Sequence, residues 1–131
     1  MIVVDASALT NLMVYTDERG TRASEAMNRD SEWVAPEHWR AETFSAIRGL
    51  TLGRKIEEAQ GAKAVRRIAW LTIHAAPLDP LLPRMWELRN NISAYDAAYV
   101  AVAEDRMAAL VTADARLATA ASAYCRVELV S

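Results

Sequence analysis

Short apolar runs alternate along this chain with longer segments of helical character, and this alternation restricts the possible folds more than any other feature of the sequence. The apolar runs predict strands at residues 2–4, 33–35, 74–78, 109–112 and 125–130. Strands that are separated by helices are joined by right-handed crossovers, which favour parallel pairing. We therefore expect an α/β fold with three layers, in which helices cover both faces of a mainly parallel central sheet.

The segments between the apolar runs carry helix signals. The expected helices cover about residues 8–15, 19–28, 36–53, 56–73, 80–89 and 115–121, and another helix begins at residue 94. Ser7 offers a side-chain oxygen that could cap the first helix. In the helix over 36–53, Phe44, Ile47 and Leu50 recur at helical spacing and should face the core. A narrow, mostly small line of the same helix should approach other backbone closely; it consists of His38, Glu42, Ser45 and Gly49.

Length and composition favour one soluble domain that spans residues 1–131. Apolar residues make up 53% of the 131 residues, which is enough for a single core. The lone Cys125 cannot form an internal disulfide and is interpreted as a small core residue. We expect no leader peptide, and no apolar run approaches the roughly 18 residues of a membrane span. The sequence therefore predicts a cytoplasmic protein that has no membrane partner.

Four acidic residues are expected at one edge of the predicted sheet. Asp5 and Asp114 each follow an apolar strand, and the carboxyl ends of parallel strands meet at the edge where open α/β folds place their sites. Glu42 and Asp96 join them through the helices on which they lie. Asp96 begins a line on its helix that should be the buried side; this line continues through Val100, Ala103 and Met107. A carboxylate at the head of an apolar line needs compensation.

Each acid also has a purely structural interpretation. Ser93 and Asp96 have the spacing of a capping box, and Asp114 has the position of a simple N-cap. Asp5 could hold the turn after the first strand, and Glu42 could pair with an arginine at position 40 or 48. Four unpaired carboxylates at one edge would nevertheless repel each other, and a divalent cation would remove that repulsion. Oxygen ligands favour Mg²⁺ or Mn²⁺ over zinc, because the chain has only two histidines and one cysteine.

The other chemically versatile side chains have ordinary structural interpretations. His38 stands four residues before Glu42 and could be a further ligand, although histidines in a first helical turn are more often exposed. The tryptophans are expected to be core or interface anchors; they are Trp33, Trp39, Trp70 and Trp86. The net charge of −2 neither favours nor excludes nucleic acid, because the clustering of basic residues matters more than their sum.

Four motifs in this order resemble those of the PIN-domain ribonucleases of the VapC toxin type. They are VVDASAL at 3–9, PEHWRAETFSAIR at 36–48, SAYDAAYVAVAE at 93–104 and LVTADARL at 110–117. The resemblance covers essentially the whole chain and implies a PIN-like fold. It implies that the acidic, metal-binding and catalytic cluster consists of Asp5, Glu42, Asp96 and Asp114. Ser7 and Thr112 are then polar neighbours that orient carboxylates or water.

One position departs from the pattern of this family. Some relatives have a further acid just after the position of Asp114, whereas this chain has Arg116. This difference puts a fully occupied second metal site in doubt. Proteins of this family also resemble each other in forming homodimers and in being inhibited by a cognate antitoxin, whose tail lies across the active-site groove. The resemblance therefore implies an antitoxin and a second copy of the chain as partners.

The hypothesis that follows is Mg²⁺-dependent endonucleolytic cleavage of RNA, with Mn²⁺ as a substitute. The metal would activate a water for in-line attack, and the products would carry 5′-phosphate and 3′-hydroxyl ends. A local concentration of basic residues is a candidate for contact with the RNA backbone; it consists of Arg48, Arg54, Lys55, Lys63, Arg66 and Arg67. A solvated charged surface is the simpler interpretation of the same residues.

Three other functions fit parts of the pattern. An aspartate-based phosphohydrolase also uses an acid after the first strand, but it usually needs a second Asp two residues later, where this chain has Ser7. A receiver-like signalling domain needs adjacent acids and a lysine at the end of a late strand, whereas Asp5 is followed by Ala6 and the last apolar run has no lysine. A catalytically silent PIN-like module that binds RNA or protein fits the sequence as well.

Overall fold

The computed structural model describes residues 1–131 and has a parallel sheet at its centre. The strands are β1 (Ile2–Val4), β2 (Trp33–Pro36), β3 (His74–Ala76), β4 (Ala109–Thr112) and β5 (Val127–Leu129). They are ordered β3-β2-β1-β4-β5, and every neighbouring pair is parallel. The α/β prediction is therefore confirmed, and the sheet is entirely rather than mainly parallel. The most apolar run, β1, occupies the centre.

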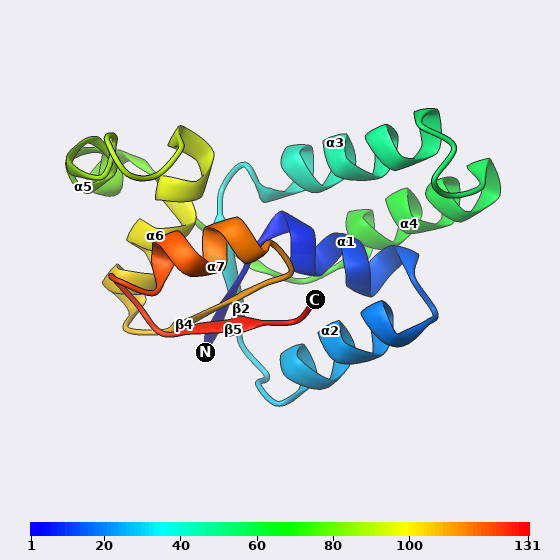
Figure 1. Cartoon of the computed structure of the whole chain (residues 1–131), viewed down its shortest axis with the longest axis horizontal. Helices are drawn as coiled ribbons and strands as arrows, with labels where there is room; N and C mark the ends of the chain where they lie inside the picture. Colours follow the sequence, from blue (N-terminus) through cyan, green and yellow to red (C-terminus); the bar gives the residue numbers. More distant parts are fainter.

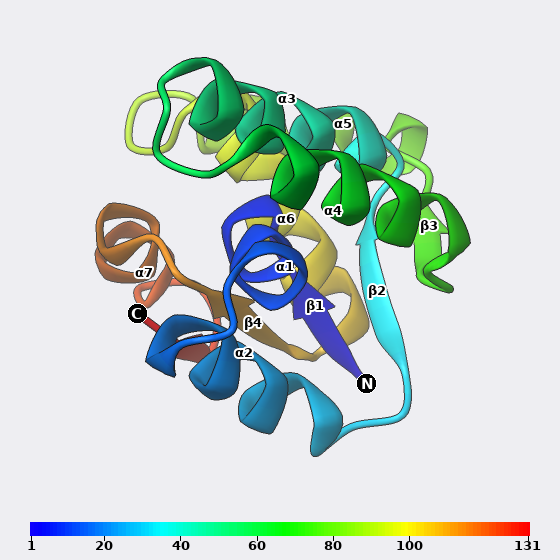
Figure 2. The ribbon, with the colours of Figure 1, turned by 90° about the vertical axis from the view of Figure 1, so that its right-hand side faces the viewer.

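Helices cover both faces of this sheet. They are α1 (Ala6–Val14), α2 (Glu18–Asn28), α3 (Trp39–Leu52), α4 (Glu58–Trp70), α5 (Leu82–Glu87), α6 (Ala94–Arg106) and α7 (Ala115–Ala121). Figure 1 shows α6 and α7 on one side of the strands and α1, α2 and α4 on the other, and Figure 2 shows α3 and α4 stacked outside α1. The strands β2 and β3 lie on one side of β1, and the strands β4 and β5 lie on the other side. The direction in which the chain adds strands to the sheet therefore changes at β1.

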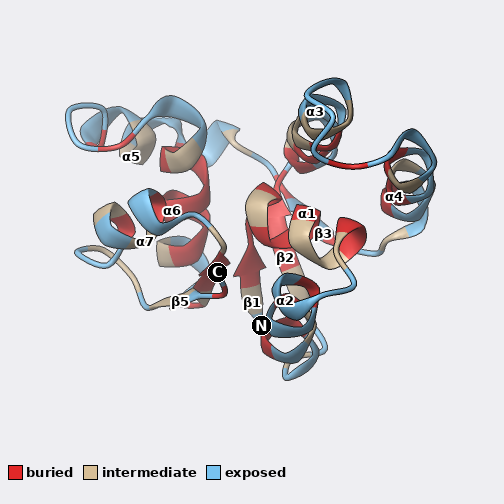
Figure 3. Ribbon diagram, turned by 45° about the vertical axis from the view of Figure 1, so that its right-hand side comes forward, coloured by how far each residue is buried: buried red, intermediate tan, exposed pale blue.

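The core lies between the sheet and the helices that cover its two faces. Figure 3 shows the buried residues concentrated in the strands and on the inner sides of α1 and α6. The small residues of α6 let this helix lie close to β1, β2 and β4, so that its whole stretch from Ala97 to Ala103 is buried. Trp39 and Tyr99 are the largest fully buried side chains. No helix is both long enough and apolar enough to cross a bilayer.

Several local expectations are wrong. Asp5, not Ser7, caps α1, because its Oδ1 accepts the backbone N–H of Ala8 and the helix begins at Ala6. Met107 does not continue the buried line of α6: it ends the helix in a left-handed conformation (φ 49°) and is 89% exposed. The predicted helix over 80–89 divides into a 3₁₀ turn, Asp79–Leu81, and the short α5, because prolines are accommodated only in a first turn.

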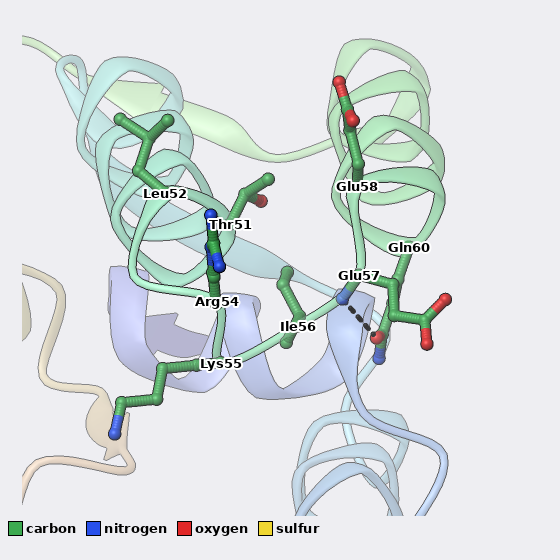
Figure 4. A pocket seen from close by; sticks show the side chains of 8 residues that line it. All are labelled: Thr51, Leu52, Arg54, Lys55, Ile56, Glu57, Glu58 and Gln60. Atoms are coloured by element: carbon green, nitrogen blue, oxygen red, sulfur yellow. Dashed lines mark hydrogen bonds between the residues drawn. The ribbon is translucent and has the colours of Figure 1, made fainter.

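The outer helices α3 and α4 form an arm whose packing also differs from the expectation. Ile47 is buried against the core, but Phe44 is 47% exposed because α3 extends past the strands and only one side of it is covered. A β-carbon at Gly49 would meet nothing within 4 Å, so this line of α3 makes no close approach to backbone. Figure 4 shows the turn at the end of the arm, where the backbone N–H of Glu57 donates to Gln60 Oε1 and α4 begins.

The remaining aromatic residues and the cysteine divide between core and surface. Trp39 is buried and Trp33 packs partly on the core, whereas Trp70 and Trp86 are exposed. Cys125 is partly buried and packs against the core, in agreement with its interpretation as a structural residue. Burial raises the pKa of its thiol.

Candidate active site

Asp5 is the most buried acid of the chain and lies at the carboxyl end of the central strand β1. Only 4% of its surface is exposed. Its Oδ1 accepts hydrogen bonds from Ser7 Oγ (2.7 Å) and the Ala8 backbone N–H (2.8 Å), and its Oδ2 accepts one from Thr112 Oγ1 (2.6 Å). These donors come from α1 and from the neighbouring strand β4, so the carboxylate is fixed at the junction of three elements.

The environment of Asp5 opposes its ionisation. Burial raises the pKa of its carboxyl to about 6, although its three hydrogen bonds lower the pKa, and the charge of Glu42 raises it further. An acid with a raised pKa in a polar, partly closed site is typical of functional positions. No cationic side chain is among the groups that influence the pKa of Asp5.

Ser7 and Thr112 link the ends of β1 and β4. Thr112 Oγ1 accepts the backbone N–H of Asp114 (3.0 Å), and Ser7 Oγ accepts that of Ala113 (2.9 Å). The two hydroxyl oxygens lie 3.2 Å apart. The chain segment that leads into Asp114 is thus held by the same hydroxyls that hold Asp5. This places the polar neighbours that the sequence predicts beside the carboxylate that they were expected to orient.

Asp114 and Asp96 line one pocket at this edge. Asp114 is the N-cap of α7, where its Oδ1 accepts the backbone N–H groups of Arg116 (2.9 Å) and Leu117 (3.2 Å). Asp96 is half-buried in the first turn of α6, and burial raises the pKa of its carboxyl, with the charge of Asp114 as an additional cause. The capping-box interpretation of Ser93 is wrong, because its side chain does not cap the helix. Both acids line a pocket of about 370 Å³ together with Arg116.

Glu42 lies in the first turn of α3 and faces the same edge. It pairs with neither nearby arginine: Arg40 instead donates to the carbonyls of Ile68 (3.4 Å) and Leu71 (3.2 Å). The Nε2 of His38 lies 4.0 Å from Glu42 Oε2. Burial and, next, the charge of Glu42 raise the pKa of Tyr99, which shows that the phenol and this carboxylate are close.

The four acids therefore occupy one edge as two pairs, Asp5 with Glu42 and Asp96 with Asp114. No three acidic, histidine or cysteine side chains of the chain stand close enough to share one ion as they are oriented here. The donor chemistry nevertheless suits a hard divalent cation, because the available ligands are carboxylate and hydroxyl oxygens. Glu42 and Asp114 are the less buried member of each pair.

The basic residues that the sequence suggests for RNA contact lie along the α3–α4 arm. Arg48 and Lys55 follow Glu42 on α3 and its turn, and the helical rise carries the end of α3 roughly 15 Å from Glu42. Lys63, Arg66 and Arg67 line a groove on α4 that is separate from the pocket of Asp96. Arg67 also has a structural role, since its Nη1 donates to the carbonyl of Met13 (3.0 Å).

Two further residues, Arg116 and Tyr99, lie next to the acids. Arg116, which stands where some relatives have an acid, is exposed and lines the pocket of Asp96 and Asp114. Tyr99 is a neighbour of the acids that the sequence motifs do not single out. Its spacing, three residues after Asp96, was the available signal, because residues i and i+3 share one side of a helix.

Comparison with known proteins identifies the family. The family model described as the PIN domain matches residues 2–123. The chain is 38% identical to ribonuclease VapC9 of Mycobacterium tuberculosis over 131 residues, which cover 99% of this chain and 98% of that protein. It is 36% identical to ribonuclease VapC12 of the same species, with complete coverage of both chains.

Solved structures with the same fold include two proteins of lower sequence identity. The crystal structure of Mycobacterium tuberculosis VapC20, a toxin that cleaves the sarcin–ricin loop, matches with a TM-score of 0.68 at 19% identity and covers 92% of this chain and 95% of that one. The structure of FitAcB from Neisseria gonorrhoeae gives a TM-score of 0.69 at 16% identity, with 97% and 96% covered. Together with the match over residues 2–123 and the full-length relatives, this fold shows that the chain belongs to the PIN-domain family.

Proposed function

We propose that the protein is an endoribonuclease that depends on a divalent cation and acts as the toxin of a toxin–antitoxin pair. The observation that supports this most strongly is the position of Asp5 and Asp114 after the neighbouring central strands β1 and β4, each coupled by charge to a second acid from a helix. The full-length relatives VapC9 and VapC12 are ribonucleases by name, which favours RNA as the substrate.

The cation that this donor set suits is Mg²⁺, with Mn²⁺ as a substitute. The residues that would hold it are Asp5, Glu42, Asp96 and Asp114. A cation held there would supply the Lewis acidity that lets a water lose a proton and become nucleophilic at neutral pH, and it would offset the negative charge of a departing 3′ oxygen; cleavage of this kind gives 5′-phosphate and 3′-hydroxyl ends. Because no separate general base is needed, the scarcity of histidine agrees with this chemistry.

The side chains of the protein prepare this reaction by orientation and charge. Ser7 and Thr112 hold the Asp5 carboxylate in one orientation, and the backbone N–H groups at the start of α7 fix one oxygen of Asp114. The guanidinium of Arg116 lies at the same pocket, where it can bind a phosphate of the RNA next to the acids. The basic residues of the α3–α4 arm extend the positive surface for a longer strand; they include Arg48, Arg54, Lys55, Lys63, Arg66 and Arg67.

The same proposal assigns protein partners. A cognate antitoxin would inhibit the enzyme, and the active form would be a homodimer in the cytoplasm. Large apolar side chains that remain exposed on α3 and α5, such as Leu52 and Trp86, are available for protein contacts of this kind. Light scattering during size-exclusion chromatography tests the dimer, and a monomer at micromolar concentration would contradict it.

Asp96→Asn tests the proposed reaction directly. It removes one charge from the pocket without changing side-chain shape, so we expect Mn²⁺- or Mg²⁺-dependent RNA cleavage to fall by at least about 100-fold while the circular dichroism spectrum stays the same. Asp105→Asn is the matched control, because Asp105 is an exposed acid of the same helix. Full cleavage by Asp96→Asn would exclude Asp96 from the site.

Sequencing the 5′ ends of RNA after induced expression of the wild type and of Asp96→Asn identifies the target.

The absence of a three-ligand group in the present orientation favours a second candidate, a PIN-like module that binds RNA or protein without cleaving it. Isothermal titration with Mn²⁺ separates the two. Binding that disappears in Asp96→Asn supports the enzyme, whereas no binding by the wild type supports the silent module. The aspartate-based phosphohydrolase gains no support, because the residue two positions after Asp5 is Ser7 and not a second aspartate.

A further inference from the structure

Buried side-chain nitrogen or oxygen atoms without a hydrogen-bond partner occur in three residues, His38, Trp39 and Tyr99, and two of these, His38 and Tyr99, lie next to Glu42. The hydroxyl of Tyr99 is one of them, in a residue that is only 1% exposed. The other is the imidazole of His38, both of whose nitrogens are buried and unpaired. Buried donors without acceptors are rare because they lose their water and gain nothing in return. Two of them beside one carboxylate therefore require an explanation.

The packing around His38 fixes the ring. His38 is the N-cap residue of α3, but its side chain does not cap the helix. Its ring lies between two tyrosines of α6: the centroid of Tyr95 is 5.4 Å away with the planes tilted by 43°, and that of Tyr99 is 5.6 Å away in an edge-on arrangement. This aromatic contact leaves Nε2 directed at Glu42, 4.0 Å from Oε2.

Glu42 is the carboxylate that lies next to both groups. It follows His38 by four residues, so the two side chains lie on the same side of α3. The carboxylates of Glu42 and Asp5 are both close enough to the Tyr99 hydroxyl to raise its pKa, with burial as the largest cause. The Glu42 side chain is partly exposed, and its Oε2 already lies 4.0 Å from His38 Nε2.

We propose that His38 and Tyr99 are positioning residues that donate hydrogen bonds to the Glu42 carboxylate and orient it toward Asp5 for cation binding. The inference rests on the proposed function, since it assigns Glu42 to the cation. Groups that hold a metal-binding side chain from behind restrict its orientation and strengthen the site. In this arrangement His38 at the start of α3 and Tyr99 of α6 both orient Glu42, which itself belongs to α3.

Tyr99→Phe is the sharpest test, because it removes one oxygen and keeps the ring that packs against His38. We expect the Mn²⁺ dissociation constant from isothermal titration to rise by about 10-fold or more, which is the usual effect of losing such a group. The melting temperature in EDTA should stay the same or rise, because an unpaired buried hydroxyl is removed. Tyr95→Phe is the matched control: it lies on the same helix and touches the same histidine, but its residue is 67% exposed.

His38 is tested by a pair of variants that differ only in their hydrogen-bonding capacity. The amide nitrogen of His38→Gln reaches about as far as the imidazole Nε2, whereas His38→Leu has no donor. We expect His38→Leu to weaken Mn²⁺ binding by about 10-fold or more and His38→Gln to restore most of it. The loss of RNA cleavage activity in Tyr99→Phe should become smaller when Mn²⁺ is saturating. The KM of this variant for RNA should be the same as that of the wild type.

The outcomes separate this inference from the proposed function. If the wild type binds Mn²⁺ and Tyr99→Phe and His38→Leu bind it equally well, the positioning role is excluded and the metal-dependent enzyme is retained. If the wild type itself does not bind Mn²⁺, the proposed function fails and the inference fails with it. If either variant melts at a lower temperature in EDTA, and this loss of stability accounts for its weaker Mn²⁺ binding, the inference is also overturned. The residue would then stabilise the core and would have no separate role in orienting Glu42.

Discussion

At the scale of a single residue, Asp5 is subject to two opposing effects, because burial disfavours its ionised form and hydrogen bonds favour it. Its side chain is buried at the end of the central strand, where an ionised carboxylate is costly, yet three donors hold it in the orientation of an acceptor. The raised pKa of about 6 shows that the hydrogen bonds do not fully offset burial. Without a cation, the ionised Asp5 carboxylate therefore lowers the free energy of unfolding at neutral pH.

Asp5→Asn should stabilise the protein in EDTA at neutral pH. The folded pKa of about 6 lies above the ordinary value of 3.8, so the contribution of Asp5 to stability is complete below about pH 4 and is lost as the pH rises through about 6. The neutral amide avoids this loss, and we expect a gain of about 2–3 kcal/mol at pH 7.5 in urea denaturation.

The comparison at low pH is the control for this prediction. Near pH 4 the wild-type carboxyl is protonated in the folded state, so Asp5→Asn and wild type should have nearly the same free energy of unfolding. Thr112 Oγ1 can accept the new amide N–H and donate to Ser7 Oγ, which lies 3.2 Å away. A destabilisation of equal size at both pH values would mean that the lost hydrogen-bond geometry, and not charge, determines the effect.

At the scale of elements, Gly20 determines how closely α2 approaches the end of α1. A β-carbon at this position would lie 1.9 Å from the backbone oxygen of Tyr15, and backbone cannot move aside as a side chain can. We expect Gly20→Ala to destabilise the protein by about 1–3 kcal/mol, measured by urea denaturation. An unchanged midpoint would show that α2 shifts freely on α1.

Gly49→Ala is expected to have the opposite sign. Gly49 is exposed on α3, and an added β-carbon meets nothing within 4 Å. Alanine restricts the unfolded chain and favours the helix, so the variant should gain about 0.5–1 kcal/mol and about 2–4 °C in melting temperature. RNA cleavage should be unchanged. A loss of stability here would indicate that this side of α3 is covered by another copy of the chain.

The sequence predicts the strands well and the side-chain partners poorly. The runs at 2–4 and 109–112 match β1 and β4 because buried parallel strands are continuous apolar segments. The partners of Glu42 could not be predicted in the same way. Arg40 is its neighbour in sequence but donates to carbonyls at the end of α4, a contact that exists only after α3 and α4 have packed together. The prediction that Phe44 faces the core is wrong for the same reason, since periodicity does not show where the sheet ends.

For the whole molecule, strand order explains why residues more than a hundred positions apart lie together at one edge of the sheet. The chain leaves β1 toward β2 on one side and returns to pair β4 on the other, so the carboxyl ends of β1 and β4 border the point where the connections diverge. Open α/β sheets bind ligands at such a point. Asp5 and Asp114 stand on its two sides, and α3 and α6 bring Glu42 and Asp96 from opposite layers.

Because the four acids come from both layers, a cation that joins them should stabilise the entire fold. At roughly 100 times its dissociation constant, Mn²⁺ should add about 2.7 kcal/mol, or about 8–10 °C in melting temperature. Binding requires ionised Asp5, so this gain should increase as the pH rises through about 6, where the cation-free protein loses stability. Differential scanning fluorimetry between pH 5 and pH 8 measures both trends. A gain that is independent of pH, or equal in Asp5→Asn, would place the cation elsewhere on the molecule.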